Sequence, residues 1–340
     1  MLRCAKRRGT PRMKVLTLGR HALGGCASIA FLAACSSTGL QPLNGAAGTT
    51  PQKPTVAIRE QHKGSWMTGE AKAQDLLYVS AISTSSVYVY SYPKGELVGT
   101  LTGFDMPQGL CSDTKGNVFV ANYRATNLIE YAHGGTTPIA TIADPNYWPE
   151  GCAVDRTTGN LAVTDNGADG EGGMAVYLHA TGSPHRHRAP HMFYYFFCGY
   201  DDQGDLFVDG ENYASIPTTE LAEISGGAQR LVDITMDQSI GLPGGVQWDG
   251  NYLAVGDAEN GVIYQFKISG NTGTREGTTS LNDSSTVNQF WIQDSAVIGA
   301  NFDSPSIMFW NYPAGGQPRK TIETHHKWRQ VFGATISVAN

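Results

Sequence analysis

Charged residues are scarce in this chain of 340 residues, of which only 16% are Asp, Glu, Lys or Arg. The chain also lacks a glycine-rich phosphate-binding loop, zinc-knuckle spacing and the Gly-x-Ser-x-Gly motif of a nucleophile elbow. These absences remove the sequence support for those three kinds of site. Glycine is abundant instead, at 41 residues, and it accompanies many Tyr, Val and Thr, a composition typical of an all-β protein rich in turns.

Acidic residues are missing from the N-terminal segment, where none precedes Glu60, while seven basic residues lie within 3–20. A run of small apolar residues, 22–34, follows and is typical of an export signal, because it is too short to span a bilayer comfortably. Its end, Leu32-Ala-Ala-Cys35, resembles the lipobox of bacterial lipoproteins. The resemblance implies cleavage before Cys35, attachment of acyl chains to that residue and a stable membrane anchor. An ordinary secretory signal is the alternative.

The predicted organisation follows from this leader. Residues 1–34 form the signal peptide, 35–73 the lipidated Cys35 and a flexible tether rich in Gly, Pro, Thr and Ser, and 74–340 the folded domain. We expect an exported protein anchored to the outer membrane, facing the periplasm or the cell surface. Beyond the leader, 17 basic residues stand against 30 acidic ones, a net charge of −13. Such a domain repels phosphate backbones, so nucleic acid is not an expected partner.

One short sequence motif, called here the repeated phrase, recurs through the folded domain: it consists of an apolar run, an Asp/Gly/Asn turn and a second apolar run. The aspartates that open its copies are 42, 46, 48 and 45 residues apart, at Asp113, Asp155, Asp201, Asp249 and Asp294. Each copy predicts two strands joined by a tight turn. A strand-rich repeat of this length is typical of β-propeller blades.

Ring closure is predicted from the two ends of the domain. The first unit, 76–101, lacks the leading strand of later copies, whereas 331–338 is a strand with no unit of its own. Propellers close their ring by pairing such a strand with the first blade. The sequence therefore predicts an all-β, six-bladed propeller, with later blades at about 107–142, 149–190, 193–234, 243–281 and 287–323.

Only three cysteines, Cys111, Cys152 and Cys198, lie in the domain, each shortly before a repeat aspartate. We expect them to be buried thiols that pack as small core side chains. The alternative is that equivalent strands of neighbouring blades bring two of them close together.

The phrase from Pro107 to Asn122, Pro-Gln-Gly-Leu-Cys-Ser-Asp-Thr-Lys-Gly-Asn-Val-Phe-Val-Ala-Asn, resembles those of NHL-type and gluconolactonase- or regucalcin-like propellers and of streptogramin lyases. The likeness covers roughly 70–340 and implies the fold rather than an activity. Gluconolactonase-like enzymes hold a divalent cation with a Glu from a Glu-Gly-Pro phrase, which Glu150-Gly-Cys152 matches only in part. The histidines of the lyases have no counterpart at the repeat ends.

Polar and aromatic side chains recur where first strands begin and second strands end, which is one face of the ring. Such a mouth suits a sugar-like or cationic ligand, or a divalent ion such as Ca²⁺. For single residues, turn formation and loop capping is the competing interpretation. The candidate ligand-binding residues are Gln108, Asn122, Tyr123, Trp148, Glu150, Asp165, Asp209, Glu211, Asp257, Gln289 and Asn301.

The polar and aromatic residues on this face are consistent with two functions. The first is a binding or scaffold module for a protein, glycan or small molecule. The alternative is a divalent-metal-dependent hydrolase or lactonase, in which Glu150, Asp165 and Asp257 would hold the cation. No catalytic residue is identified beyond that metal set, and no cofactor other than such a cation is expected.

Overall fold

The computed structural model describes residues 64–340, apart from 145, 168–170, 227–229, 305 and 325–329. They belong to the second of the two units into which the chain divides, Glu60–Asn340. The predicted leader and the predicted lipidation site at Cys35 lie outside the described residues. Within the described ranges, no helix has the length and apolar character needed to cross a bilayer.

The repeated turn forms through its aspartate, as predicted. The Asp113 Oδ1 accepts hydrogen bonds from the backbone N–H groups of Lys115 (2.9 Å) and Asn117 (2.7 Å). Between them Gly116 has a φ of 81°, a left-handed conformation that costs glycine little. The same side-chain capping recurs at Asp201 and Asp249. Each turn thus reverses the chain between a first and a second strand.

Nearly all regular structure in the described part of the chain is β-strand. The sheet that begins the domain contains β1 (Trp66–Met67), β4 (Leu97–Thr102), β3 (Ser86–Ser91), β2 (Leu76–Ala81) and β25 (Val331–Ser337), in that order. Two four-stranded sheets follow: β5 (Pro107–Ser112), β6 (Val118–Asn122), β7 (Asn127–Tyr131) and β8 (Pro138–Ala143), then β9 (Tyr147–Val154), β10 (Leu161–Gly167), β11 (Gly173–Tyr177) and β12 (His185–His187).

The second half of the domain repeats this pattern. An eight-stranded sheet comprises β13 (Tyr194–Tyr200), β14 (Leu206–Glu211), β15 (Thr219–Ile224), β16 (Val232–Met236), β20 (Thr272–Ser280), β19 (Val262–Ser269), β18 (Leu253–Asp257) and β17 (Pro243–Trp248). The last sheet contains β21 (Val287–Gln293), β22 (Ala296–Asn301), β23 (Ser306–Asn311) and β24 (Lys320–Glu323). Short 3-10 helices are η1 (Gly69–Ala73), η2 (Ile82–Thr84), η3 (Tyr123–Ala125) and η4 (Leu178–Ala180).

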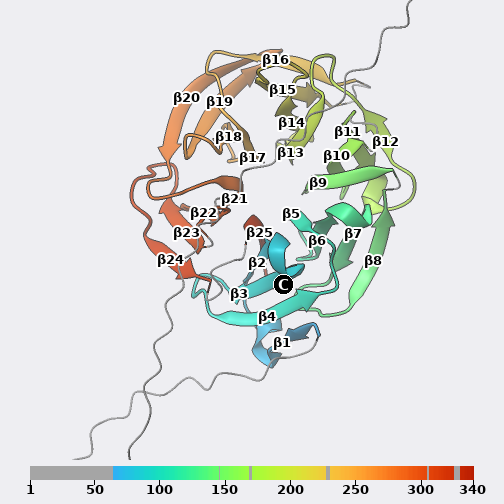
Figure 1. The fold of residues 1–340 in the computed structure, drawn as a ribbon, viewed down its shortest axis with the longest axis vertical. Coiled ribbons are helices and arrows are strands. Elements are labelled where there is room, and N and C mark those ends of the chain that lie inside the picture. Colours follow the sequence, from blue (N-terminus) through green and yellow to red (C-terminus); the bar gives the residue numbers. More distant parts are fainter. Residues whose placement is uncertain (1–63, 145, 168–170, 227–229, 305, 325–329) are drawn as a thin grey trace, which may run out of the picture. The chain divides into compact units, whose positions relative to one another are not determined.

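These sheets follow one another around a central axis, as in a β-propeller (Figure 1). The innermost strands β25, β5, β9, β13, β17 and β21 each contact the next, and β21 contacts β25. The ring closes as predicted, because β25 pairs antiparallel with β2, with Ile336 opposite Leu77. The eight-stranded sheet arises where the outer strands β16 and β20 pair in parallel, with Thr235 opposite Thr272. This pairing joins two predicted blades at their outer edges.

The first sheet also includes residues from the segment predicted as a tether. Strand β1 pairs with β4, with Trp66 opposite Thr100, and the helix η1 lies between β1 and β2. The last described residues of that segment therefore contribute to the folded domain.

Hydrophobic cores lie between consecutive sheets because strand side chains alternate in direction. In β2, Leu77 and Val79 pack with Ile298 of β22, whereas Leu76 and Tyr78 pack with residues of β5 and β6. Both faces of this strand are buried. Burial on both faces explains why second strands such as β2 and β6 are nearly continuous apolar runs.

The innermost strands approach one another backbone to backbone at glycines. A Cβ atom on Gly109 of β5 would lie 2.6 Å from the Glu150 carbonyl oxygen of β9. One on Gly333 of β25 would lie 2.7 Å from the Gln108 carbonyl oxygen of β5. A carbon that close would overlap its neighbour, so any side chain here would push the strands apart. Three further glycines meet the next innermost strand similarly, namely Gly151, Gly199 and Gly245.

Glycine at 333 also lets a side chain cross in front of β25. The Gln289 amide of β21 reaches past this strand to Leu110 of β5. Its Oε1 accepts from the Leu110 N–H (2.9 Å), and its Nε2 donates to the Leu110 carbonyl (2.8 Å). The side chain thus replaces a pair of strand-to-strand hydrogen bonds across the closure of the ring.

A disulfide joins Cys111 of β5 to Cys152 of β9, so the expectation of three buried thiols is wrong for these two residues. Neighbouring innermost strands bring their sulfur atoms together, as in the alternative interpretation. The bond closes a loop across a sequence separation of 41, which by chain entropy stabilises the fold by about 4 kcal/mol. Cys198 is free and buried, as expected.

We predict that Gly109→Ala destabilises the domain by about 2 kcal/mol, because its Cβ would overlap the backbone of β9. Thermal unfolding should show a melting temperature several degrees lower. Gly69→Ala is the matched control, since nothing lies within 4 Å of a Cβ there. Equal melting temperatures for the two variants would contradict close packing of the innermost strands.

Candidate functional site

Aromatic side chains block the central channel at the level where the innermost strands begin. Phe197 of β13 and Phe332 of β25 come from opposite sides of the ring, yet their ring centroids are 6.0 Å apart. Phe302, just after β22, lies 6.3 Å from Phe332. Phe197 and Phe332 are buried, so they form an apolar plug across the channel.

A cavity of about 590 Å³ lies on the other side of this plug. Its lining comes from the C-terminal ends of the innermost strands and from the turns that follow them. Phe197 and Phe290 are part of the apolar lining, and the Cys111–Cys152 disulfide contributes to the wall. This volume and mixed lining are typical of a small-ligand or side-chain binding site.

The cavity wall includes three half-buried aromatic residues, Tyr200, Trp248 and Trp291. The Trp248 indole is oriented by a hydrogen bond from its Nε1 to the Asp202 carboxylate (2.8 Å). The Trp291 Nε1 donates to Gln293 (3.3 Å). These rings offer π faces beside charged groups, an arrangement that suits cations.

The charged residues that line the cavity are predominantly acidic. A single base, Arg156, stands against five acids, which are Asp113, Asp201, Asp202, Asp249 and Asp294. Three of these are the turn-capping aspartates described above, and Asp294 also opens a copy of the phrase. In these turns the carboxylates accept hydrogen bonds from backbone N–H groups. The repeated turns at Asp113, Asp201, Asp249 and Asp294 thus place acidic side chains at the edge of the cavity, and these four residues together with Asp202 are here called the acidic rim.

The candidate residues from the sequence lie towards the opposite, plugged face, although Gln289 also lines the cavity, and eight of the eleven are buried. The exceptions are Trp148, which is 37% exposed, and the half-buried Tyr123 and Glu211. The rings of Tyr123 and Trp148 pack together with centroids 5.8 Å apart. This face is therefore not an open polar mouth, because phenylalanines fill its centre and most polar side chains serve the fold.

Several of these side chains cap loops, which confirms the competing interpretation for them. The Asn122 Oδ1 accepts from the Asp105 N–H (2.6 Å), and the Asn301 Oδ1 accepts from the Ser285 N–H (3.1 Å). Asp257 accepts from the N–H groups of the 241–242 and 260 backbone. The Asp209 Oδ1 accepts from the backbone of β13, and burial raises the pKa of Asp209 well above its usual value.

Gln108 and Glu150 form a buried pair between β5 and β9. With the Gln108 amide nitrogen facing Glu150, it donates to Oε1 (2.5 Å) and Oε2 (2.8 Å). Asn166 also donates to Glu150, at 3.4 Å. Burial raises the pKa of Glu150 to about 8, although the bond from Asn166 opposes the shift. The carboxyl thus carries little of the negative charge that the prediction assigned to it.

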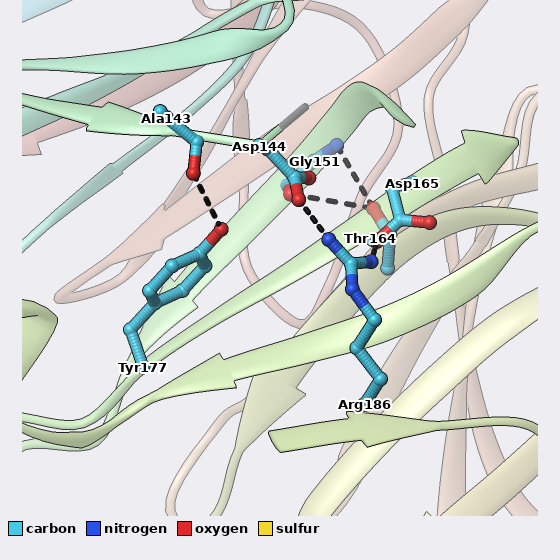
Figure 2. Close-up of polar contacts among 7 residues, drawn as sticks. All are labelled: Ala143, Asp144, Gly151, Thr164, Asp165, Tyr177 and Arg186. Atoms are coloured by element: carbon cyan, nitrogen blue, oxygen red, sulfur yellow. Dashed lines mark hydrogen bonds and ion pairs between the residues drawn. The ribbon is translucent and has the colours of Figure 1, made fainter. Parts of the chain in front are cut away.

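Asp165 belongs to a buried ion cluster rather than to an open site (Figure 2). Arg186 of β12 contacts Asp144, just after β8, and Asp165 of β10 (2.8 Å). Its guanidinium lies 3.6 Å from the centroid of the Tyr147 ring. One guanidinium thereby links two neighbouring sheets. Within the described residues the other Asp165 oxygen, Oδ1, has no hydrogen-bond partner.

The proposed metal ligands are not gathered by the fold. Asp165 pairs with Arg186, Asp257 caps a loop of another sheet, and Glu150 pairs with Gln108. In the described part of the chain, no group of three or more His, Cys, Asp or Glu residues is arranged to hold a metal ion.

The sequence reasoning missed the cavity, although its signal is in the repeat. Tyr200 and Trp248 immediately precede the opening aspartates of their copies, and Trp291 lies three residues before Asp294. When the copies are aligned on their opening aspartates, the polar candidate residues fall at one face of the ring and these three aromatic residues fall at the other.

Comparison with solved structures identifies the architecture. A chain in the crystal structure of a nidogen/laminin complex matches with a TM-score of 0.62 and 16% identity, covering 78% of this chain and 99% of that one. The chain has a β-propeller fold. A protein of unknown function from Bacteroides caccae matches with a TM-score of 0.57 and 12% identity, again over 78% and 99% of the two chains. No protein-family model matches the sequence, and no curated protein matches it either.

We predict that Asp165→Asn flattens the pH dependence of stability. Burial, and then the charge of Asp144, raise the pKa of Asp165 from 3.8 to about 7. Because the folded protein holds this proton more tightly than the unfolded chain, stability is lost as pH rises through about 7. The loss accumulates between the unfolded pKa near 3.8 and the folded pKa of about 7, at about 1.4 kcal/mol per pH unit, and it ends above that range.

Urea unfolding at pH 5.5, 7 and 8.5 measures this effect. The variant should lose less stability than the wild type between pH 5.5 and 7, where the folded wild type still holds the proton, and the two curves should become nearly parallel towards pH 8.5. Parallel curves for the two proteins between pH 5.5 and 7 would show that Asp165 does not bind a proton in this range.

Proposed function

We propose that this chain is an exported, lipid-anchored protein whose six-bladed, NHL-like propeller is a binding module. Its ligand is held in the cavity on the turn side of the channel. The observation that carries the proposal is the aromatic cavity, closed at one end by the phenylalanine plug. A blind, aromatic-lined cavity excludes water from a bound apolar group, which favours binding.

The blade count rests on the innermost strands. Six of them follow one another around the ring, and the eight-stranded sheet counts as two blades because only its outermost strands β16 and β20 join it. Six hydrophobic clusters, each between consecutive blades, support the same count.

A protein is the partner we favour. The neighbouring structure in the nidogen/laminin complex belongs to a protein assembly. A propeller offers its loops on a rigid ring, which is how binding loops are usually presented.

Export and anchoring rest on the leader and its lipobox-like end at Cys35. The Cys111–Cys152 disulfide is in keeping with an oxidising compartment. We expect the protein expressed in a bacterium to incorporate labelled palmitate and to sediment with membranes. Cys35→Ser should abolish both properties. Membrane association of the unlabelled variant would contradict anchoring through Cys35.

Ligand binding in the cavity predicts where small aromatic fragments bind. In a fragment screen by ligand-observed NMR, Val338→Trp should remove most hits, because Val338 is an exposed lining residue and a bulky ring there obstructs the mouth. Ile139→Trp is the matched control, since Ile139 is also exposed but lies on β8, outside the lining. Equal hit lists for the two variants would place fragment binding elsewhere and refute the cavity as the site.

A further inference from the structure

The acidic residues at the repeat positions differ in burial between the two faces of the ring. On the plugged face, burial raises the pKa values of Glu150, Asp165 and Asp209, and their side chains are directed into the fold. On the turn face, the aspartates that line the cavity are half-buried or exposed, and Asp113, Asp201 and Asp249 accept backbone hydrogen bonds. Five acidic side chains therefore surround the cavity mouth, against a single arginine.

The cavity itself is apolar at depth and charged at its rim. Phe197, Phe290 and the disulfide lie along the innermost strands, whereas the acidic rim sits on the turns. Trp248 and Trp291 line the wall, with Asp202 hydrogen-bonded to the first of them. A complementary ligand has an apolar group that enters the cavity and cationic groups that remain at the rim.

The acidic rim is distributed around the ring rather than gathered at one point. Asp113, Asp201, Asp249 and Asp294 follow the first strands of four different blades. One small cation cannot contact carboxylates on four blades, but an extended chain with several cations can. This distribution favours a peptide over a small amine.

We propose that the cavity binds a basic peptide segment of a partner protein, which inserts one apolar side chain and places flanking Lys or Arg residues at the acidic rim. The inference rests on the proposed function, since it names the ligand class of the same cavity. The aromatic wall supplies the apolar contact, and the rim selects the charge.

Calorimetry with synthetic capped peptides tests the proposal directly. The probe Lys-Lys-Phe-Lys-Lys should bind, whereas Glu-Glu-Phe-Glu-Glu, which has the same anchor, and Lys-Lys-Gly-Lys-Lys, which has none, should bind at least about tenfold more weakly. Affinity for the first should fall severalfold between 20 and 200 mM NaCl, because charges at the rim are screened.

Variants of the rim separate charge from folding. Asp202→Asn plus Asp294→Asn should weaken binding about tenfold, since neither carboxylate caps the repeated turn with backbone bonds. Asn also tolerates the left-handed backbone at Asp294, where φ is 54°. The control is Asp283→Asn plus Asp303→Asn, which removes the same charge from exposed positions outside the lining, with φ of 62° at Asp283. This control should bind like the wild type.

Each result decides between explanations. If the acidic peptide binds as tightly, or both double variants behave alike, the charge inference fails, while loss of binding in Val338→Trp would still support the cavity. If Lys-Lys-Gly-Lys-Lys binds as tightly, or Val338→Trp has no effect on peptide binding, attraction to the acidic surface alone explains the affinity and the cavity is not the site. If phenethylammonium binds as tightly as the basic peptide, the ligand is a small amine and the peptide proposal is wrong.

Discussion

The close approach of the innermost strands is the constraint on which this fold depends. Six strands converge on one axis, and glycines such as Gly109 and Gly333 allow their backbones to touch. No side chain fits between the backbones of adjacent innermost strands at these glycines. Longer side chains from elsewhere on these strands therefore make contacts with strands that are not adjacent in the ring. Gln289 crosses β25 to pair with Leu110, and Phe197 meets Phe332 from the opposite side. Close packing therefore narrows the channel enough for a few phenylalanines to block it, which leaves a cavity on the turn side of the plug.

The same turns that build the blades also determine the electrostatics of the domain. A tight turn needs an acceptor for its exposed backbone N–H groups, and an aspartate such as Asp113 or Asp201 supplies one. Repetition around a ring converts this local requirement into an acidic rim. At the ends of the second strands, aspartates are buried instead: burial raises the pKa of Asp165 and of Asp209, and Asp165 also pairs with Arg186.

The repeat made much of the fold predictable, because strand alternation, turn chemistry and the spacing of aspartates are local properties of the sequence. Closure through β25 was predictable too, since a missing strand at one end matches a spare strand at the other. The site was not. Its position depends on which end of the channel Phe197, Phe302 and Phe332 fill, and these residues come from three different sheets. The pairing of Cys111 with Cys152 likewise depends on the register between strands that share no turn.

Fold similarity at 12–16% identity conveys the architecture of the ring but not a site, so recognition must come from positions where the copies differ. The residue directly before each opening aspartate is such a position. It is Ser112 and Val154 in two consecutive copies, but Tyr200 and Trp248 in the next two. The cavity is consequently asymmetric, with the disulfide on one side and the aromatic residues on the other. The acidic residues are spread around the ring, so the acidic rim selects a positively charged ligand. The aromatic contact is confined to one side, so the aromatic wall determines where the apolar group of that ligand lies.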